Sequence, residues 1–210
     1  MLNGAESSET RTTHDYPVIA KSDDPENASL SLWPFIVREP AFDEAGKTEG
    51  ETISIGIKSN SSTMYSGGGG QASWLSLYRF PANRYGDPMM SEVLGVPIDA
   101  SIMIRACFAE KDMALRRGAC HDLYDFDATL TLGITAIGAP PVLIYQTKAT
   151  AEPGNSRRSG DNSGTQLSAA DILLRTDARC SYRRELTMNP VTGRYEFDRP
   201  GPDCSEYTVP

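Results

Sequence analysis

The chain has 210 residues, of which 28 are acidic and 20 basic, giving a formal net charge of −8. This length suits one generous domain or two small ones, and a charged fraction of 23% is typical of a folded protein rather than a disordered one. No apolar run approaches the roughly 20 residues that a membrane-crossing helix needs, so the sequence predicts no membrane span.

The negative charge is concentrated near the N-terminus. Residues 1–60 hold 11 acidic and 5 basic side chains, which accounts for −6 of the total. This balance disfavours nucleic-acid binding, because that function requires clustered Lys and Arg. Residues 1–29 are polar and show no periodicity, so we expect a partly disordered arm, followed by a single domain over residues 30–210. The sequence contains no charged-then-apolar secretory leader.

From residue 30 onward, apolar and polar residues alternate. The clearest run spans residues 121–137, where the even positions from Tyr124 are apolar and the odd positions include aspartates and threonines. A period of two predicts a strand with one dry and one wet face. The other predicted strands are Leu30–Arg38, Glu51–Lys58, Ser73–Phe80, Ser101–Phe108, Val142–Thr150, Ile172–Arg175, Ser181–Met188 and Arg194–Phe197.

The spacing of these segments predicts an all-β fold. Short strands separated by Gly, Pro and Asn favour an antiparallel β-sandwich, or a flattened barrel, of about eight or nine strands. Helix is expected only as minor turns, within 89–94 and 167–174. Two polar segments, 59–72 and 152–166, are expected to be mobile loops, and such loops on a rigid β scaffold often bind partners.

Four cysteines indicate the compartment. Their nested order favours the pairs Cys107–Cys120 and Cys180–Cys204, each closing a local excursion of the chain. An even number with local pairing indicates an oxidising compartment, periplasmic or extracellular. The alternative is an intracellular protein with four buried, reduced thiols. A zinc site using Cys107, Cys120, His121 and an aspartate lacks the close Cys-x-x-Cys spacing typical of such sites, and we expect neither metal nor cofactor.

The densest cluster of functional groups comprises His121, Asp122, Asp125 and Asp127. On a strand, His121, Asp125 and Asp127 share one face, where they could bind a cation or perform acid–base catalysis. The wet face of an amphipathic strand explains the same pattern, and we favour that interpretation. There is no Gly-x-Ser-x-Gly motif. An enzyme is therefore the second hypothesis: an extracytoplasmic hydrolase or carbohydrate-active enzyme using these aspartates.

The first hypothesis is a secreted or periplasmic, non-catalytic binding module for an unidentified protein or carbohydrate. Its partner surface would comprise the segments 59–72 and 152–166 with the acidic arm. Candidate binding residues are Tyr65 and Trp74, which could form an aromatic platform, and the pair Arg157 and Arg158. We favour core packing as the explanation of the aromatic residues, and solvated loop or strand-face positions as the explanation of the arginines.

Overall fold

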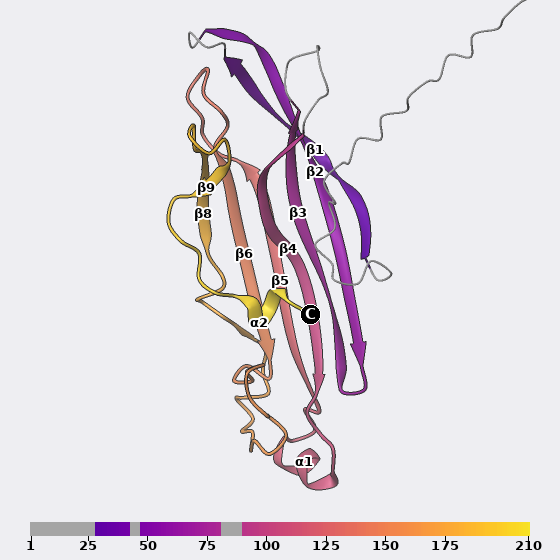
Figure 1. The fold of residues 1–210 in the computed structure, drawn as a ribbon. Coiled ribbons are helices and arrows are strands. Elements are labelled where there is room, and N and C mark those ends of the chain that lie inside the picture. The colour runs from indigo at the N-terminus through magenta and orange to yellow at the C-terminus, as the bar shows by residue number, and fades with distance from the viewer. Residues whose placement is uncertain (1–27, 43–46, 81–89) are drawn as a thin grey trace, which may run out of the picture.

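The described part of the chain forms one antiparallel sheet. The computed structural model describes residues 28–42, 47–80 and 90–210, and the sheet order is β1-β2-β3-β4-β5-β6-β8-β9, with β7 pairing β6 (Figure 1). The predicted all-β, antiparallel fold is confirmed. The strands are β1 (Ala28–Phe42), β2 (Thr48–Tyr65), β3 (Gly68–Phe80), β4 (Ser91–Arg105), β5 (His121–Leu132), β6 (Leu143–Glu152), β7 (Arg175–Thr176), β8 (Arg183–Met188) and β9 (Tyr195–Phe197).

One face of the sheet carries the core. Alternation in β5 buries Tyr124, Phe126 and Leu130, as predicted. The strand ends at Leu132, and from this residue on the apolar side chains at even positions are exposed. The core continues through the central strands and is closed by Tyr207 of the C-terminal helix. Other members of this cluster are Leu75, Leu77, Val93, Val96, Ile102, Leu143, Tyr145 and Leu186.

The sheet curls so that its first and last strands meet at one end. The Tyr195 hydroxyl of β9 donates a hydrogen bond of 3.1 Å to Oε1 of Glu39 in β1. Arg79 of β3 forms an ion pair with the same carboxylate and donates to the carbonyl oxygen of Gly193, 3.3 Å away. These side-chain contacts join the two halves, although the ladder of strand pairs stays open. The result is a flattened, curled sheet.

The prediction of a mobile loop over residues 59–72 is wrong. Residues 59–65 belong to β2 and residues 68–72 to β3, joined by a tight turn. The glycines that indicated flexibility permit close packing instead. A Cβ on Gly68 would lie 2.2 Å from the carbonyl oxygen of Met103 on β4, so only glycine allows the strands to approach here.

Two short helices complete the described structure, α1 (Glu110–Leu115) and α2 (Ser205–Thr208). Neither has the length or the apolar character needed to cross a bilayer, and no other helix occurs in the described ranges. Within 167–174 the chain forms a single hydrogen-bonded turn, from the Asp171 N–H to the carbonyl oxygen of Ser168 at 3.2 Å, and no helix. Residues 91–94 belong to β4, and residue 89 lies outside the described residues. The expected strand at 172–175 is reduced to β7.

Both predicted disulfides, Cys107–Cys120 and Cys180–Cys204, are confirmed. The first closes the connection that contains α1, and the second ties the segment before β8 to α2. Residues 1–27 of the expected arm lie outside the described residues, while residues 28 and 29 already belong to β1.

Candidate functional site

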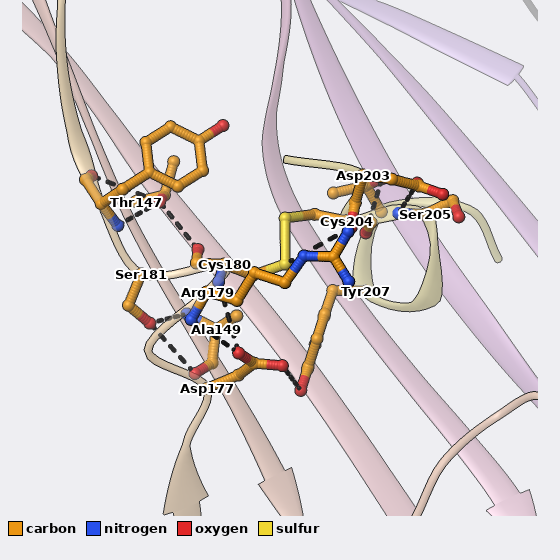
Figure 2. Close-up of a disulfide and its surroundings, with 12 residues drawn as sticks. Thr147, Ala149, Asp177, Arg179, Cys180, Ser181, Asp203, Cys204, Ser205 and Tyr207 are labelled. Carbon is orange, nitrogen blue, oxygen red and sulfur yellow. Dashed lines mark hydrogen bonds between the residues drawn. A yellow bond between two sulfur atoms is a disulfide. The ribbon is translucent and has the colours of Figure 1, made fainter. Parts of the chain in front are cut away.

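A hollow lies beside the Cys180–Cys204 disulfide, where the C-terminal helix packs over the sheet. It has a volume of about 280 Å³ and adjoins a second hollow of about 160 Å³. Arg157, Asp177 and Tyr207 line both, so the two hollows are neighbours, and we refer to them together as the depression. Figure 2 shows the Arg179 side chain extending past the disulfide toward Asp203 and Ser205.

The wall of this hollow is a non-strand segment, 177–182, that β6 holds in place. Thr147 Oγ1 donates to the carbonyl oxygen of Cys180 at 2.8 Å and accepts from the backbone N–H of Tyr182 at 2.9 Å. The Ala149 N–H donates to Ser181 Oγ at 2.9 Å (Figure 2). Side-chain hydrogen bonds supplement the backbone bonds where the ladder breaks between β7 and β8, so the segment keeps its polar groups bonded without forming a strand.

Asp177 is the hydrogen-bonding centre of the wall. Its carboxylate accepts from the backbone N–H of Arg179 at 2.8 Å, from that of Cys180 at 3.4 Å and from the Tyr207 hydroxyl at 3.0 Å. Burial pushes the pKa of Asp177 upward, but these bonds and the nearby Arg157 charge outweigh it, so the pKa lies below its usual value. Burial, the hydrogen bond and the Asp177 charge raise the pKa of Tyr207. Asp177 is therefore ionised and Tyr207 protonated at neutral pH.

This arrangement predicts how acid affects stability. A depressed folded-state pKa stabilises the fold above the unfolded-state value, about 4, and that contribution disappears as the pH falls through the folded pKa. We expect Asp177→Asn, which cannot ionise, to be less stable than the native chain at pH 7, with the difference shrinking below about pH 4. Urea unfolding at several pH values measures it. If the free energies of unfolding of the native chain and of Asp177→Asn differed by the same amount at every pH, the lowered pKa of Asp177 would be contradicted.

Three arginines surround the hollow with unused hydrogen-bond donors. Each guanidinium offers five N–H donors. Arg157 donates to the carbonyl oxygen of Ser156 at 2.8 Å, and Arg175 to Asn155 Oδ1 at 2.8 Å. Within the described ranges, no hydrogen bond engages the guanidinium of Arg179. All three side chains are exposed.

Two of the three acidic side chains that line the hollow, Asp177 and Asp203, accept hydrogen bonds from the wall itself. Asp203 accepts from the Ser205 N–H at 3.0 Å, which together with the Ser205 hydroxyl lowers the pKa of this exposed carboxyl. Asp177 is bonded as described above. Glu206 also lines the hollow. The depression thus presents unused guanidinium donors beside two carboxylates, those of Asp177 and Asp203, that accept hydrogen bonds within the wall, and beside a third carboxylate, that of Glu206.

The structure separates the predicted binding residues. Arg157 lines the hollow, but Arg158 donates to the carbonyl oxygens of Glu206 and Val209 and so fastens the C-terminal segment. Tyr65 ends β2, opposite Gly68, and the half-buried Trp74 lies six residues farther along β3, about 20 Å away. The two aromatic side chains therefore form no shared platform.

Of the predicted catalytic residues, three lie along one face and one lies on the other. His121 and Asp127 are exposed and Asp125 half-buried, with Asp99 of β4 directly opposite Asp127. Burial, then the Asp127 and Asp125 charges, raise the pKa of Asp99, while Lys58 opposes them. Asp99 lines a separate polar hollow of about 260 Å³. A catalytic role for these residues stays a prediction.

Asp122 has a structural partner. It lies on the buried face, paired with Arg116, and accepts from Asn162 Nδ2 at 2.8 Å. Arg116 also donates to the carbonyl oxygen of Ala119 at 2.8 Å and to that of Asn162 at 2.5 Å. This buried network joins the α1 connection to the segment 152–166. Among the residues with described positions, no three His, Cys, Asp or Glu side chains are grouped as a metal site would require.

Sequence reasoning missed Arg175 and Arg179, although a signal was present. Both arginines lie shortly before Cys180, a residue of a predicted disulfide, and Asp177 between them opens a turn in which its carboxylate accepts from the Arg179 N–H. The signal was therefore the disulfide, which holds in place the backbone that carries the two arginines.

Comparison with known proteins gives no assignment: no protein-family model, curated protein or solved structure matches the chain.

Proposed function

We propose that the chain is a secreted or periplasmic binding module, without catalysis, whose ligand presents carboxylate or another oxyanion to the hollow beside Cys180–Cys204. The observation that carries the proposal is the set of three exposed arginines, Arg157, Arg175 and Arg179, around one depression with most of their donors unused. Guanidinium groups bind planar oxyanions through paired hydrogen bonds.

The rigidity of the wall supports binding at this position. The disulfide, the Thr147 and Ser181 hydrogen bonds and the Tyr207–Asp177 bond hold the backbone between the arginines. A preformed site loses less conformational entropy when a ligand binds. Two disulfides also favour the oxidising compartment.

The test uses the oxidised full chain and two carboxylate probes, a hexaglutamate peptide and an oligogalacturonate of similar charge, which represent protein and carbohydrate ligands. We expect Arg157→Gln/Arg179→Gln to weaken calorimetric binding of the preferred probe at least about tenfold. The control Arg183→Gln/Arg199→Gln removes the same charge from exposed arginines elsewhere and should bind normally. Equal loss in both variants, or no binding of either probe, would refute the proposal.

The same samples address the second candidate, an extracytoplasmic hydrolase. What favours it is Asp99, which lies opposite Asp127 and lines a polar hollow. Burial, and then the Asp127 charge, raise the pKa of Asp99, which suits a general acid. Under our proposal, mass spectrometry should find the oligogalacturonate intact after incubation. Cleavage that disappears in Asp127→Asn would favour the hydrolase instead.

A further inference from the structure

Two hairpins expose aliphatic side chains at the end of the sheet opposite α1. In the β5–β6 connection, Leu132 is 69% exposed, Ile134 is 99% exposed and Ile137 is fully exposed. In the β8–β9 turn, Val191 is 91% exposed. We call these four residues the apolar tip.

The strand register brings the two hairpins together. Leu143, at the start of β6, pairs with Leu186 of β8, so β8 continues toward its turn alongside the β5–β6 connection. Both turns lie at the same end in Figure 1. The apolar tip therefore belongs to one end of the molecule rather than to two separate sites.

The segments around the apolar tip are poor in charge. Residues 128–147 include no Asp, Glu, Lys, Arg or His, and neither do residues 189–193. A stretch of 20 residues without charge is unusual in a chain that is 23% charged. At the β8–β9 turn the carboxylate of Glu196 accepts hydrogen bonds from Asn189 Nδ2 and Thr192 Oγ1, both at 2.9 Å. The charge-free part of the tip is therefore the β5–β6 connection, whose insertion into an apolar environment would require none of its own groups to lose water as a charge.

The connection is structured, although its side chains project. The N–H of Gly133 donates to the carbonyl oxygen of Val142 at 2.7 Å, and the N–H of Val142 to Thr135 Oγ1 at 2.8 Å. Pro140 and Pro141 have no N–H to satisfy. Internal bonding and the two prolines reduce the number of backbone donors that must lose water at an interface.

We propose that the apolar tip inserts into the boundary between headgroups and acyl chains of a phospholipid bilayer. The side chains of Ile134, Ile137 and Val191 are almost fully exposed, and they belong to two turns that project at one end of the sheet (Figure 1). A protein partner would need matching cavities to bury them, whereas fluid lipid closes around any convex shape. The uncharged β5–β6 connection suits the acyl boundary and needs no anionic headgroup. This surface is distinct from the arginine-lined hollow.

The experiment is co-sedimentation of the oxidised full chain with vesicles of phosphatidylcholine alone and of equal parts phosphatidylcholine and phosphatidylglycerol. We expect binding to both, weakened at least about tenfold by Ile134→Ser/Ile137→Ser, because burial of one such side chain changes partition by about ten- to hundredfold. The control Leu173→Ser/Leu174→Ser removes two exposed aliphatic side chains far from the tip and should bind like the native chain. Circular dichroism verifies that both variants fold.

Three results would overturn the proposal. The first is no binding to either vesicle, and the second is an equal loss of binding in both variants. The third is binding to the anionic vesicles alone that Ile134→Ser/Ile137→Ser leaves unchanged. Sedimentation velocity without lipid provides the remaining comparison. Self-association of the native chain that Ile134→Ser/Ile137→Ser abolishes, with no vesicle binding, would assign the tip to a second copy of the chain and overturn the lipid assignment.

Discussion

Arg116→Met is expected to lower the free energy of unfolding by about 3–5 kcal/mol. Arg116 and Asp122 are each 1% exposed, and the substitution leaves the Asp122 carboxylate buried with only Asn162 as a side-chain donor. An uncompensated buried charge is among the most destabilising changes a single substitution can produce. Urea unfolding at neutral pH, with the disulfides intact, measures the loss.

The adjacent Arg117 provides the matched control. Its side chain is exposed, so Arg117→Met should change stability by no more than about 0.5 kcal/mol. Arg116→Met/Asp122→Leu removes both charges and should recover a large part of the loss, because no charge is then left unpaired. If Arg116→Met were as stable as Arg117→Met, the pair would not hold the α1 connection to the segment 152–166.

Removal of the Cys180–Cys204 disulfide is expected to affect both stability and binding. The cysteines are 24 residues apart, and loop closure of this length contributes about 3 kcal/mol. Cys180→Ala/Cys204→Ala should lose about this much stability. It should also bind the carboxylate probe more weakly, because Arg179 directly precedes Cys180 and the hollow loses its cross-link.

Cys107→Ala/Cys120→Ala separates the two effects. Its loop spans 13 residues, so the loss of stability should be similar, again about 3 kcal/mol. This disulfide does not line the hollow, although its loop contacts the segment 152–166 that carries Arg157, so probe affinity should fall much less than in Cys180→Ala/Cys204→Ala. Equal weakening of binding in both pairs would show that stability alone controls affinity. The native chain, denatured without reductant, should show no reactive thiol.

The strands were predictable because their signal is local. Tyr124 and Phe126 are buried at alternate positions, and the pairs Cys107–Cys120 and Cys180–Cys204 follow from order along the chain. Alternation does not reveal where a strand ends, however. The pattern continues to Ile137, while pairing stops at Leu132, and the apolar residues beyond it become exposed.

The site was only partly predictable, because it depends on contacts between distant segments. Arg157 was identified as a candidate, but its proximity to Tyr207 requires α2 to fold back over the sheet. Similarly, Arg116 lies in a charged connection and would be expected in solvent. Its burial depends on Asn162, 46 residues away. Composition predicted a loop at 59–72 because Gly and Ser usually mark turns, whereas Gly68 is required for close strand approach.

The most direct test of the proposed site is an NMR titration of the ¹⁵N-labelled, oxidised chain with the preferred carboxylate probe, observing backbone amides and arginine Nε–Hε groups. Saturable shifts should concentrate at Arg157, at residues 175–180 and at residues 203–207, which surround the hollow. Shifts centred instead on Arg183 and Arg199, or shifts that never saturate, would contradict the assignment of the hollow as the binding site.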